Sequence, residues 1–138
     1  PDAPISRAEF AKIAVSFSNV ADLSYRGYFA DVKESDWFSG FVAAAKDAGL
    51  IEGYNDGTFK PEKAITRAEV CTIVNRTLGR KPSKAHMKIS DRIDWPDVQT
   101  TDWFYEAIME ATNSHTYTGA PTETWTSLTA TPDWSQYE

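Results

Sequence analysis

Apolar residues recur at helical spacing in four stretches of the chain. The spacing predicts four helices, over about residues 6–20, 35–48, 66–78 and 101–112. The side chains expected to face a core are Phe10, Ile13, Ala14, Phe17, Trp37, Phe38, Phe41, Val42, Ala45, Val70, Ile73, Val74, Leu78, Trp103, Phe104, Ala107, Ile108 and Ala111. The predicted fold class is therefore mainly α.

The segments around these helices carry their own signals. Asn-Asp-Gly at residues 55–57 is typical of a tight turn between short extended pieces. Gly49 and Gly79 stand where left-handed helix C-caps are expected. Residues 80–94 are basic and polar around Pro82, and we interpret them as a linker.

The last part of the chain, residues 113–138, is rich in Thr, Ser and Pro but also contains large apolar side chains. These are Tyr117, Trp125, Leu128, Trp134 and Tyr137. A passive linker would have far fewer aromatic residues. We expect at least the first half of this tail to pack on the rest of the protein.

Two phrases occur twice in the sequence. The first, Ile-Ser-Arg-Ala-Glu-Phe at residues 5–10, returns as Ile-Thr-Arg-Ala-Glu-Val at residues 65–70. The second, Phe-Ala-Asp-Val followed by Asp-Trp-Phe within residues 29–38, returns as Trp-Pro-Asp-Val followed by Asp-Trp-Phe within residues 95–104. Both phrases repeat at nearly the same offset, which indicates an internal repeat. Such repeats stack because none can bury its apolar face alone.

Both copies of the first phrase fit a helix N-terminus. Ser6 with Glu9, and Thr66 with Glu69, have the spacing of a capping box, in which the hydroxyl and the carboxylate each satisfy a backbone N–H group. The helices are therefore expected to begin at these two positions.

Arg7 and Arg67 follow the caps directly, where the positive end of the helix dipole disfavours a cation. Something else must favour arginine there. One explanation is an ion pair with a nearby carboxylate. The other is that the guanidinium and the free helix N–H groups together face an anionic ligand.

The composition limits the classes of function. The chain has 138 residues, 41% of them hydrophobic, so it can form a core. A net charge of −6 argues against nucleic acid or an anionic membrane surface as a general partner. No apolar run approaches the roughly 18 residues of a membrane span. The chain begins with Pro1, which we interpret as a mature product or a piece of a larger protein.

No residue pattern indicates catalysis or a resident metal. The two histidines, His86 and His115, have no partner at metal-ligand spacing. The turn at residues 55–57 lacks the alternating acidic ligands of an EF-hand, and nucleophile signatures are missing. Cys71 is expected to be a small buried hydrophobe. We therefore expect no enzyme activity, no cofactor and no metal.

The order of motifs resembles the S-layer homology (SLH) domain. Phe-x-Asp-Val comes first, then Asp-Trp and a periodic helix, then Gly-Leu-Ile-x-Gly-Tyr-x-Asp-Gly-Thr-Phe-x-Pro, then Ile-Thr-Arg-Ala-Glu and a second helix. On this resemblance, residues 1–28 are the closing helix of a preceding repeat and residues 29–80 a complete repeat. Residues 81–94 are a linker, and residues 95–138 are an incomplete repeat with an aromatic Thr- and Ser-rich tail.

The resemblance implies both an architecture and a function. In this family three repeats form a pseudo-threefold helical spindle, of which this chain would hold a part. The grooves between repeats bind secondary cell-wall polysaccharides, often through a sugar with a negatively charged ketal pyruvate. The implied protein is secreted and anchored non-covalently at the cell wall. The alternative is a structural protein–protein module of the same fold that has lost glycan binding.

The resemblance also implies a set of ligand-binding residues. The motif arginines Arg7 and Arg67 are the expected partners of the ligand's carboxylate, and the preceding hydroxyls can donate hydrogen bonds. The complete set of candidates is Ser6, Arg7, Thr66, Arg67, Trp37, Trp103, Gly53, Tyr54 and Asp56. For the two tryptophans a core role is favoured over stacking on sugar, and for Asp56 organisation of the turn is favoured over ligand contact.

Both end repeats are incomplete, so at most two of the three family sites are expected. The first repeat lacks its opening half, and the last lacks its turn and its Arg-Ala-Glu helix. Each leaves an apolar stripe that must be covered. Either the helix at residues 6–20 packs beside the helix at residues 101–112, with the termini close together, or the incomplete repeats pair with a second chain.

Overall fold

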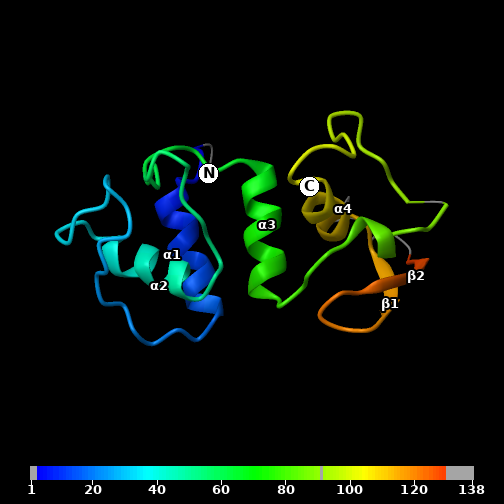
Figure 1. Ribbon diagram of the computed structural model, residues 1–138, viewed down its shortest axis with the longest axis horizontal. Coiled ribbons are helices and arrows are strands. Elements are labelled where there is room, and N and C mark those ends of the chain that lie inside the picture. The colour runs from blue at the N-terminus through cyan, green and yellow to red at the C-terminus, as the bar shows by residue number, and fades with distance from the viewer. Residues whose placement is uncertain (1–2, 91, 130–138) are drawn as a thin grey trace.

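The computed structural model describes residues 3–90 and 92–129, and most of its regular structure is helical, as predicted (Figure 1). The elements in chain order are α1 (Arg7–Phe17), α2 (Ser39–Asp47), α3 (Arg67–Thr77), the short 3-10 helix η1 (Lys84–His86), α4 (Tyr105–Thr112), β1 (His115–Thr118) and β2 (Thr124–Leu128). The two strands form an antiparallel hairpin.

The two repeated helices α1 and α3 begin where the capping boxes predict. The Ser6 hydroxyl accepts a hydrogen bond from the Glu9 N–H at 3.2 Å, and the Glu9 carboxylate accepts one from the Ser6 N–H at 2.8 Å. Thr66 and Glu69 make the same two bonds at 3.2 and 2.9 Å. Each helix start is thus determined by residues three apart in sequence.

The other two helices, α2 and α4, begin later than expected. An aspartate forms a turn just before each of them. The Asp36 carboxylate accepts from the Lys33 N–H at 2.7 Å, and Asp102 accepts from the Gln99 N–H at 2.7 Å. The tryptophan after each aspartate therefore lies in a turn and not on the helix.

The core assignment of the two repeat tryptophans is consequently wrong. Trp37 is 56% exposed and Trp103 is 71% exposed. Each packs edge-on against the phenylalanine that follows it, and Phe38 is the residue that enters the core. Five other expected core residues, on or at the end of α1, α3 and α4, are also exposed. They are Ile13, Phe17, Val74, Leu78 and Ala111.

The buried residues form two clusters that meet at α3. The first cluster joins α1 and α2 to Phe29, Phe59 and Ile73. The second joins α4 and β2 to Cys71, which is buried as expected, and to Met87 from the basic segment after α3. Ile73 and Cys71 are two residues apart on α3, so this one helix contributes to both cores.

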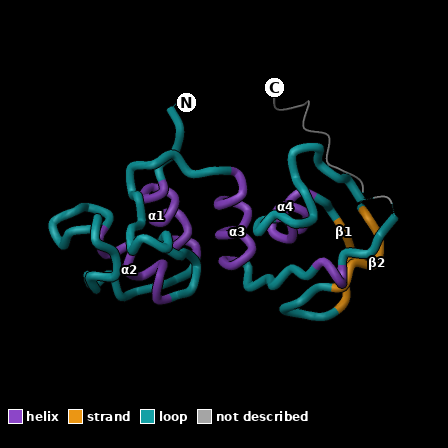
Figure 2. The backbone as a smooth tube through the Cα atoms, turned by 45° about the horizontal axis from the view of Figure 1, so that its top comes forward, coloured by secondary structure: helices purple, strands orange, loops and turns teal. Residues whose placement is uncertain are grey.

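Helix α3 lies between the α1–α2 pair and α4 with the hairpin (Figures 1 and 2). Helix α1 packs on α2 and α3, and α4 packs on the other side of α3. The expectation that α1 lies beside α4 is therefore wrong, because α3 covers both. The expected proximity of the termini concerns ends that lie outside the described residues, and pairing with a second chain stays a prediction.

The turn at residues 55–57 has the chemistry that its sequence predicts, although no strands flank it. Gly57 has a φ of +79°, a conformation that glycine adopts without strain. The Asp56 carboxylate accepts from the Thr58 N–H at 3.0 Å, so this residue organises the turn as expected. Asp31 holds the following backbone by accepting from the Phe59 and Lys60 N–H groups at 2.8 and 2.7 Å.

The first half of the tail packs on the protein as predicted. Trp125 on β2 is 5% exposed, and Trp125 and Leu128 of this strand pack in the second core. Trp134 and Tyr137 lie outside the described residues.

Within residues 3–90 and 92–129, no helix has both the length and the apolar character needed to cross a membrane.

Candidate functional site

A groove of about 430 Å³ lies between the turn segment, α3 and the segment before α4. Its lining residues come from all three repeat segments, residues 1–28, 29–80 and 95–138. They are Arg7, Leu50, Ile51, Glu52, Gly53, Tyr54, Asn55, Phe59, Ile65, Glu69, Thr72, Ile73, Arg76 and Trp103. Of the candidates proposed from the sequence, the structure brings Arg7, Gly53, Tyr54 and Trp103 together here.

Arg7 is buried at the inner wall of this groove, with 6% of its surface exposed. Its Nε donates to the Phe59 carbonyl at 2.8 Å, and a terminal nitrogen donates to the Glu52 carbonyl at 3.3 Å. The other terminal nitrogen pairs with the Glu69 carboxylate. The guanidinium also lies over the rings of Tyr54 and Phe59, at 4.9 and 4.7 Å from their centroids. Arg7 therefore both lines the groove and holds the turn segment against α1.

Glu69 supplies the carboxylate at this wall of the groove. Besides pairing with Arg7, it accepts from the Tyr54 hydroxyl at 3.1 Å and from the Thr66 N–H at 2.9 Å. Desolvation by burial raises the pKa of Glu69, but the Thr66 N–H and the Arg7 charge together bring the pKa below its ordinary value. Glu69 therefore stays ionised at neutral pH and keeps Arg7 neutralised.

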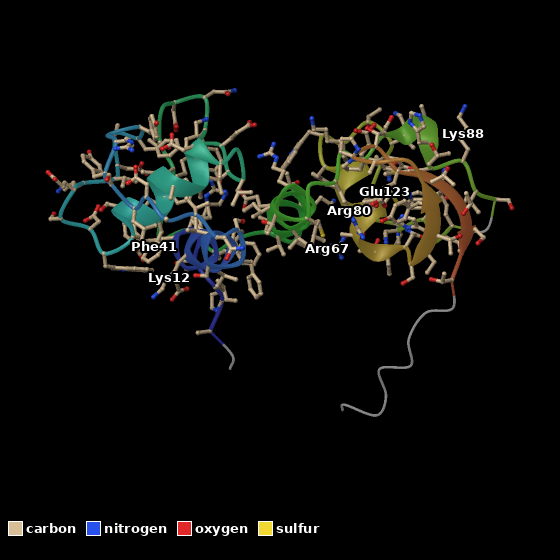
Figure 3. All side chains as sticks on the ribbon, turned by 90° about the horizontal axis from the view of Figure 1, so that it is seen from below. Lys12, Phe41, Arg67, Arg80, Lys88 and Glu123 are labelled. Atoms are coloured by element: carbon tan, nitrogen blue, oxygen red, sulfur yellow. The ribbon has the colours of Figure 1, made fainter. Side chains whose placement is uncertain are left out.

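Arg67, the second motif arginine, lies outside the groove. Its side chain is 56% exposed and pairs with Asp97 at 2.6 Å. Figure 3 shows Arg67 on α3, in the part of the helix that faces the second half of the molecule. Asp97 is the repeat counterpart of Asp31, but the last repeat has no turn for it to hold. The difference between the two arginines therefore follows from the missing turn.

Arg76 is the groove cation that sequence reasoning missed. It donates to the Glu52 carboxylate at 3.1 Å and to the Leu50 carbonyl at 3.3 Å, and its side chain is 34% exposed. The available signal was helical spacing, since Glu69, Thr72 and Arg76 are three and four residues apart and so share one face of α3. Arg76 is the more accessible of the two groove cations.

Trp103 supplies an exposed aromatic surface at the rim of the groove. Its repeat counterpart Trp37 is exposed elsewhere, near Lys12, whose Nζ lies 5.8 Å from the ring centroid. Figure 3 places Lys12 at α1 and α2, away from α3. The structure therefore separates two tryptophans that are equivalent in sequence.

The remaining candidates do not line the groove. Ser6 and Thr66 are engaged in helix capping, and Asp56 is engaged in the turn. The groove thus combines an aromatic face with two cations, each paired to a carboxylate. A flat apolar surface next to convergent polar groups suits a polar ligand that also has apolar faces, such as a sugar.

Comparison with known proteins agrees with the order of motifs. Residues 28–71 match the S-layer homology domain. The chain is 32% identical over 127 residues to cell surface glycoprotein 1 of Acetivibrio thermocellus, covering 85% of this chain and 5% of that protein. It is 37% identical over 86 residues to the middle cell wall protein of Brevibacillus brevis, covering 59% of this chain and 8% of that protein.

A third relative is the cellulosome-anchoring protein of Acetivibrio thermocellus. It is 32% identical over 123 residues, which cover 85% of this chain and 26% of that protein. The chain therefore spans only a small part of the length of each of these relatives.

Proposed function

Because residues 28–71 belong to the S-layer homology family, we propose that this chain is a cell-surface anchor that binds secondary cell-wall polysaccharide non-covalently in the groove. The names of its relatives support a role at the cell wall, since they include a cell wall protein and an anchoring protein. The protein so anchored is secreted, and the chain contributes attachment and not catalysis.

The observation that carries this proposal is the position of Trp103. Its side chain is 71% exposed, yet it lines a concave site together with Arg76. A large exposed ring on a soluble protein is favourable when it covers the apolar face of a ligand. We assign sugar stacking to Trp103 and recognition of an anionic substituent, such as a pyruvate ketal, to Arg76.

The buried arginine has a supporting role in this proposal. Arg7 makes its hydrogen bonds inside the protein, so it positions the turn that carries Gly53 and Tyr54. A direct contact between Arg7 and the ligand requires the ligand to replace Glu69 as its partner, and Arg67 has no place in this groove.

The test is sedimentation of the purified chain with cell-wall sacculi, before and after acid extraction of the secondary polymers. Binding that depends on those polymers supports the proposal. Arg76→Gln should weaken binding by about 10- to 100-fold, the value of a charge-assisted hydrogen bond. Trp103→Ala should weaken it by about fivefold, the equivalent of roughly 1 kcal/mol of stacking.

The chain offers matched controls for both variants. Trp37→Ala and Arg67→Gln remove the same kinds of side chain from exposed positions outside the groove, and they should bind as the parent does. Equal losses in Trp37→Ala and Trp103→Ala, with both folded by circular dichroism, would place the binding site elsewhere.

The alternative, a structural module without glycan binding, is favoured by one observation. Both groove cations already have carboxylate partners, Arg7 with Glu69 and Arg76 with Glu52. That alternative predicts that the folded parent does not sediment with untreated sacculi at all.

A further inference from the structure

Three ionisable side chains that are distant from the groove meet inside the second core. Glu110 comes from the end of α4, His115 from the start of β1, and Glu123 from the residue before β2. Glu110 is 2% exposed and Glu123 is 6% exposed, while the His115 side chain is 4% exposed. Their carboxylate and imidazole atoms all lie within 4.8 Å of one another. A buried cluster of this kind requires a cation or a proton to neutralise it.

Two of the three distances within the cluster match the edges of a coordination tetrahedron, and the third is at most 4.8 Å. The Nε2 atom of His115 lies 3.3 Å from an oxygen of Glu110 and 3.3 Å from an oxygen of Glu123. Ligand atoms about 2.0 to 2.1 Å from a tetrahedral zinc ion are separated by about 3.3 to 3.4 Å. The spacing of the His115 nitrogen from each carboxylate is therefore that of ligands sharing one ion.

The imidazole is held in the orientation that a metal ligand needs. Its Nδ1 lies 2.6 Å from the Asn113 carbonyl, which accepts the ring N–H and leaves the Nε2 lone pair facing the two glutamates. The ring also stacks on Trp125 at 4.2 Å between centroids. Trp125 in turn donates its indole N–H to Glu110 at 2.9 Å. These contacts hold two of the three ligands, His115 and Glu110, in their orientations.

A second observation indicates a missing cation. The Oε1 atom of Glu110 is buried and has no hydrogen-bond partner among the described residues. It is the same oxygen that faces His115 at 3.3 Å. Leaving a carboxylate oxygen unsatisfied in the interior costs free energy. A cation at this oxygen would offset that cost.

The nearby arginine does not complete the neutralisation. Arg80 lies 3.4 Å from Glu123 and 3.7 Å from Glu110, and Figure 3 shows Arg80 and Glu123 in the same half of the molecule. One guanidinium against two carboxylates leaves one negative charge when His115 is neutral. The site therefore favours a positively charged occupant.

We propose that Glu110, His115 and Glu123 bind one divalent transition-metal ion, such as Zn²⁺, which fastens the β1–β2 hairpin to α4. The imidazole ligand favours Zn²⁺ over Ca²⁺ and Mg²⁺, which prefer oxygen ligands alone. The role is structural, because the three side chains come from three segments that the ion would cross-link. This site is separate from the groove and does not depend on glycan binding.

The test uses the full chain after treatment with a chelator and its removal. Calorimetric titration with ZnCl₂ should give one site per chain. Saturating Zn²⁺ should raise the melting temperature by about 10 °C at 100 times the dissociation constant. Co²⁺ should give the visible absorption of a tetrahedral site with nitrogen and oxygen ligands and no thiolate band. Ca²⁺ and Mg²⁺ should leave the melting temperature unchanged.

Two ligand variants and one control complete the design. Glu123→Gln and His115→Gln should lower zinc affinity by more than about 100-fold, beyond the usual effect of an outer-shell residue. His86→Gln replaces the other histidine of the chain, which is exposed on η1, and should bind as the parent does. Circular dichroism of the metal-free variants checks that each is folded.

The competing state is an internal one, in which a protonated His115 supplies the missing charge itself. Nitrogen NMR of the imidazole at pH 7 distinguishes the two states, because metal binding leaves Nε2 without a proton. Absence of a one-to-one zinc isotherm in the folded parent overturns the proposal. Equal zinc affinity in the parent and in a folded Glu123→Gln variant also overturns it.

Discussion

Replacing Arg7 by Ala should destabilise the protein far more than the same change at Arg67, although both arginines occupy one position of the repeated phrase. Arg7→Ala removes the donor from two carbonyls, those of Phe59 and Glu52, and leaves Glu69 without its cation. Breaking a buried ion pair by removing one partner costs about 3–5 kcal/mol. Glu69 keeps its hydrogen bonds from the Tyr54 hydroxyl and from the N–H and hydroxyl of Thr66, so we expect the lower end, about 3 kcal/mol.

Arg67→Ala is the matched control for this prediction. Its side chain is 56% exposed and its pair with Asp97 is solvated, so its loss should cost about 0–1 kcal/mol. Urea unfolding followed by far-ultraviolet circular dichroism gives the free energy of unfolding of both variants. Destabilisation of the two variants by equal amounts would refute the assignment of Arg7 to the wall of the groove.

The pH dependence of stability gives the same prediction a second readout. The pKa of Glu69 in the folded protein lies below its ordinary value of 4.5. Its contribution to stability is therefore present above that value and is lost as the pH falls through the folded pKa. Arg7→Ala removes one of the causes that lower this pKa, so the variant should lose less stability below about pH 4.5 than the parent loses. Parallel acid curves for parent and variant would contradict the reasoning.

The remaining predictions concern the tryptophan turn and a close backbone approach. Trp37→Ala should lower the free energy of unfolding by about 1 kcal/mol, since the ring is exposed and contacts Phe38 edge-on. Phe38→Ala should lower it by about 3–5 kcal/mol, because Phe38 is buried. A melting temperature of Trp37→Ala as low as that of Phe38→Ala would contradict this. Gly53→Ala should be the costlier of two glycine changes, by about 1–3 kcal/mol, because its new methyl carbon would lie 2.3 Å from the Phe29 ring. Gly57→Ala meets nothing within 4 Å and has only its positive φ to disfavour it, and urea unfolding of both should show that order.

The starts of α1 and α3 could be predicted from the sequence because a capping box is local. Its hydroxyl and its carboxylate are three residues apart, and no distant contact is needed to place them. The family and the repeat were also predictable, because the motifs that identify them occur in a fixed order and at a fixed spacing along the sequence. The turn at residues 55–57 belongs to the same class, with Gly57 and Asp56 acting on their own neighbours.

The candidate site was only partly predictable. Four residues named from the sequence line one groove: Arg7, Gly53, Tyr54 and Trp103. Arg76 was not named, because its helical spacing with Glu69 and Thr72 marks a shared helix face and not a function. Periodicity also placed Trp37 and Trp103 in the core. The turns at Asp36 and Asp102 place both rings at the surface. These turns depend on hydrogen bonds to the aspartate carboxylates, which a pattern of apolar residues does not predict.

By itself the sequence determined the helix starts, the turn and the repeat, because each depends on residues that are near neighbours along the chain. Only the tertiary structure decided which of two equivalent arginines is buried and which of two equivalent tryptophans lines the groove. The reason is that the turn that buries Arg7 comes from the following repeat, and the repeat that follows Arg67 lacks this turn. The meeting of Glu110, His115 and Glu123 was decided in the same way, by the packing of the hairpin on α4.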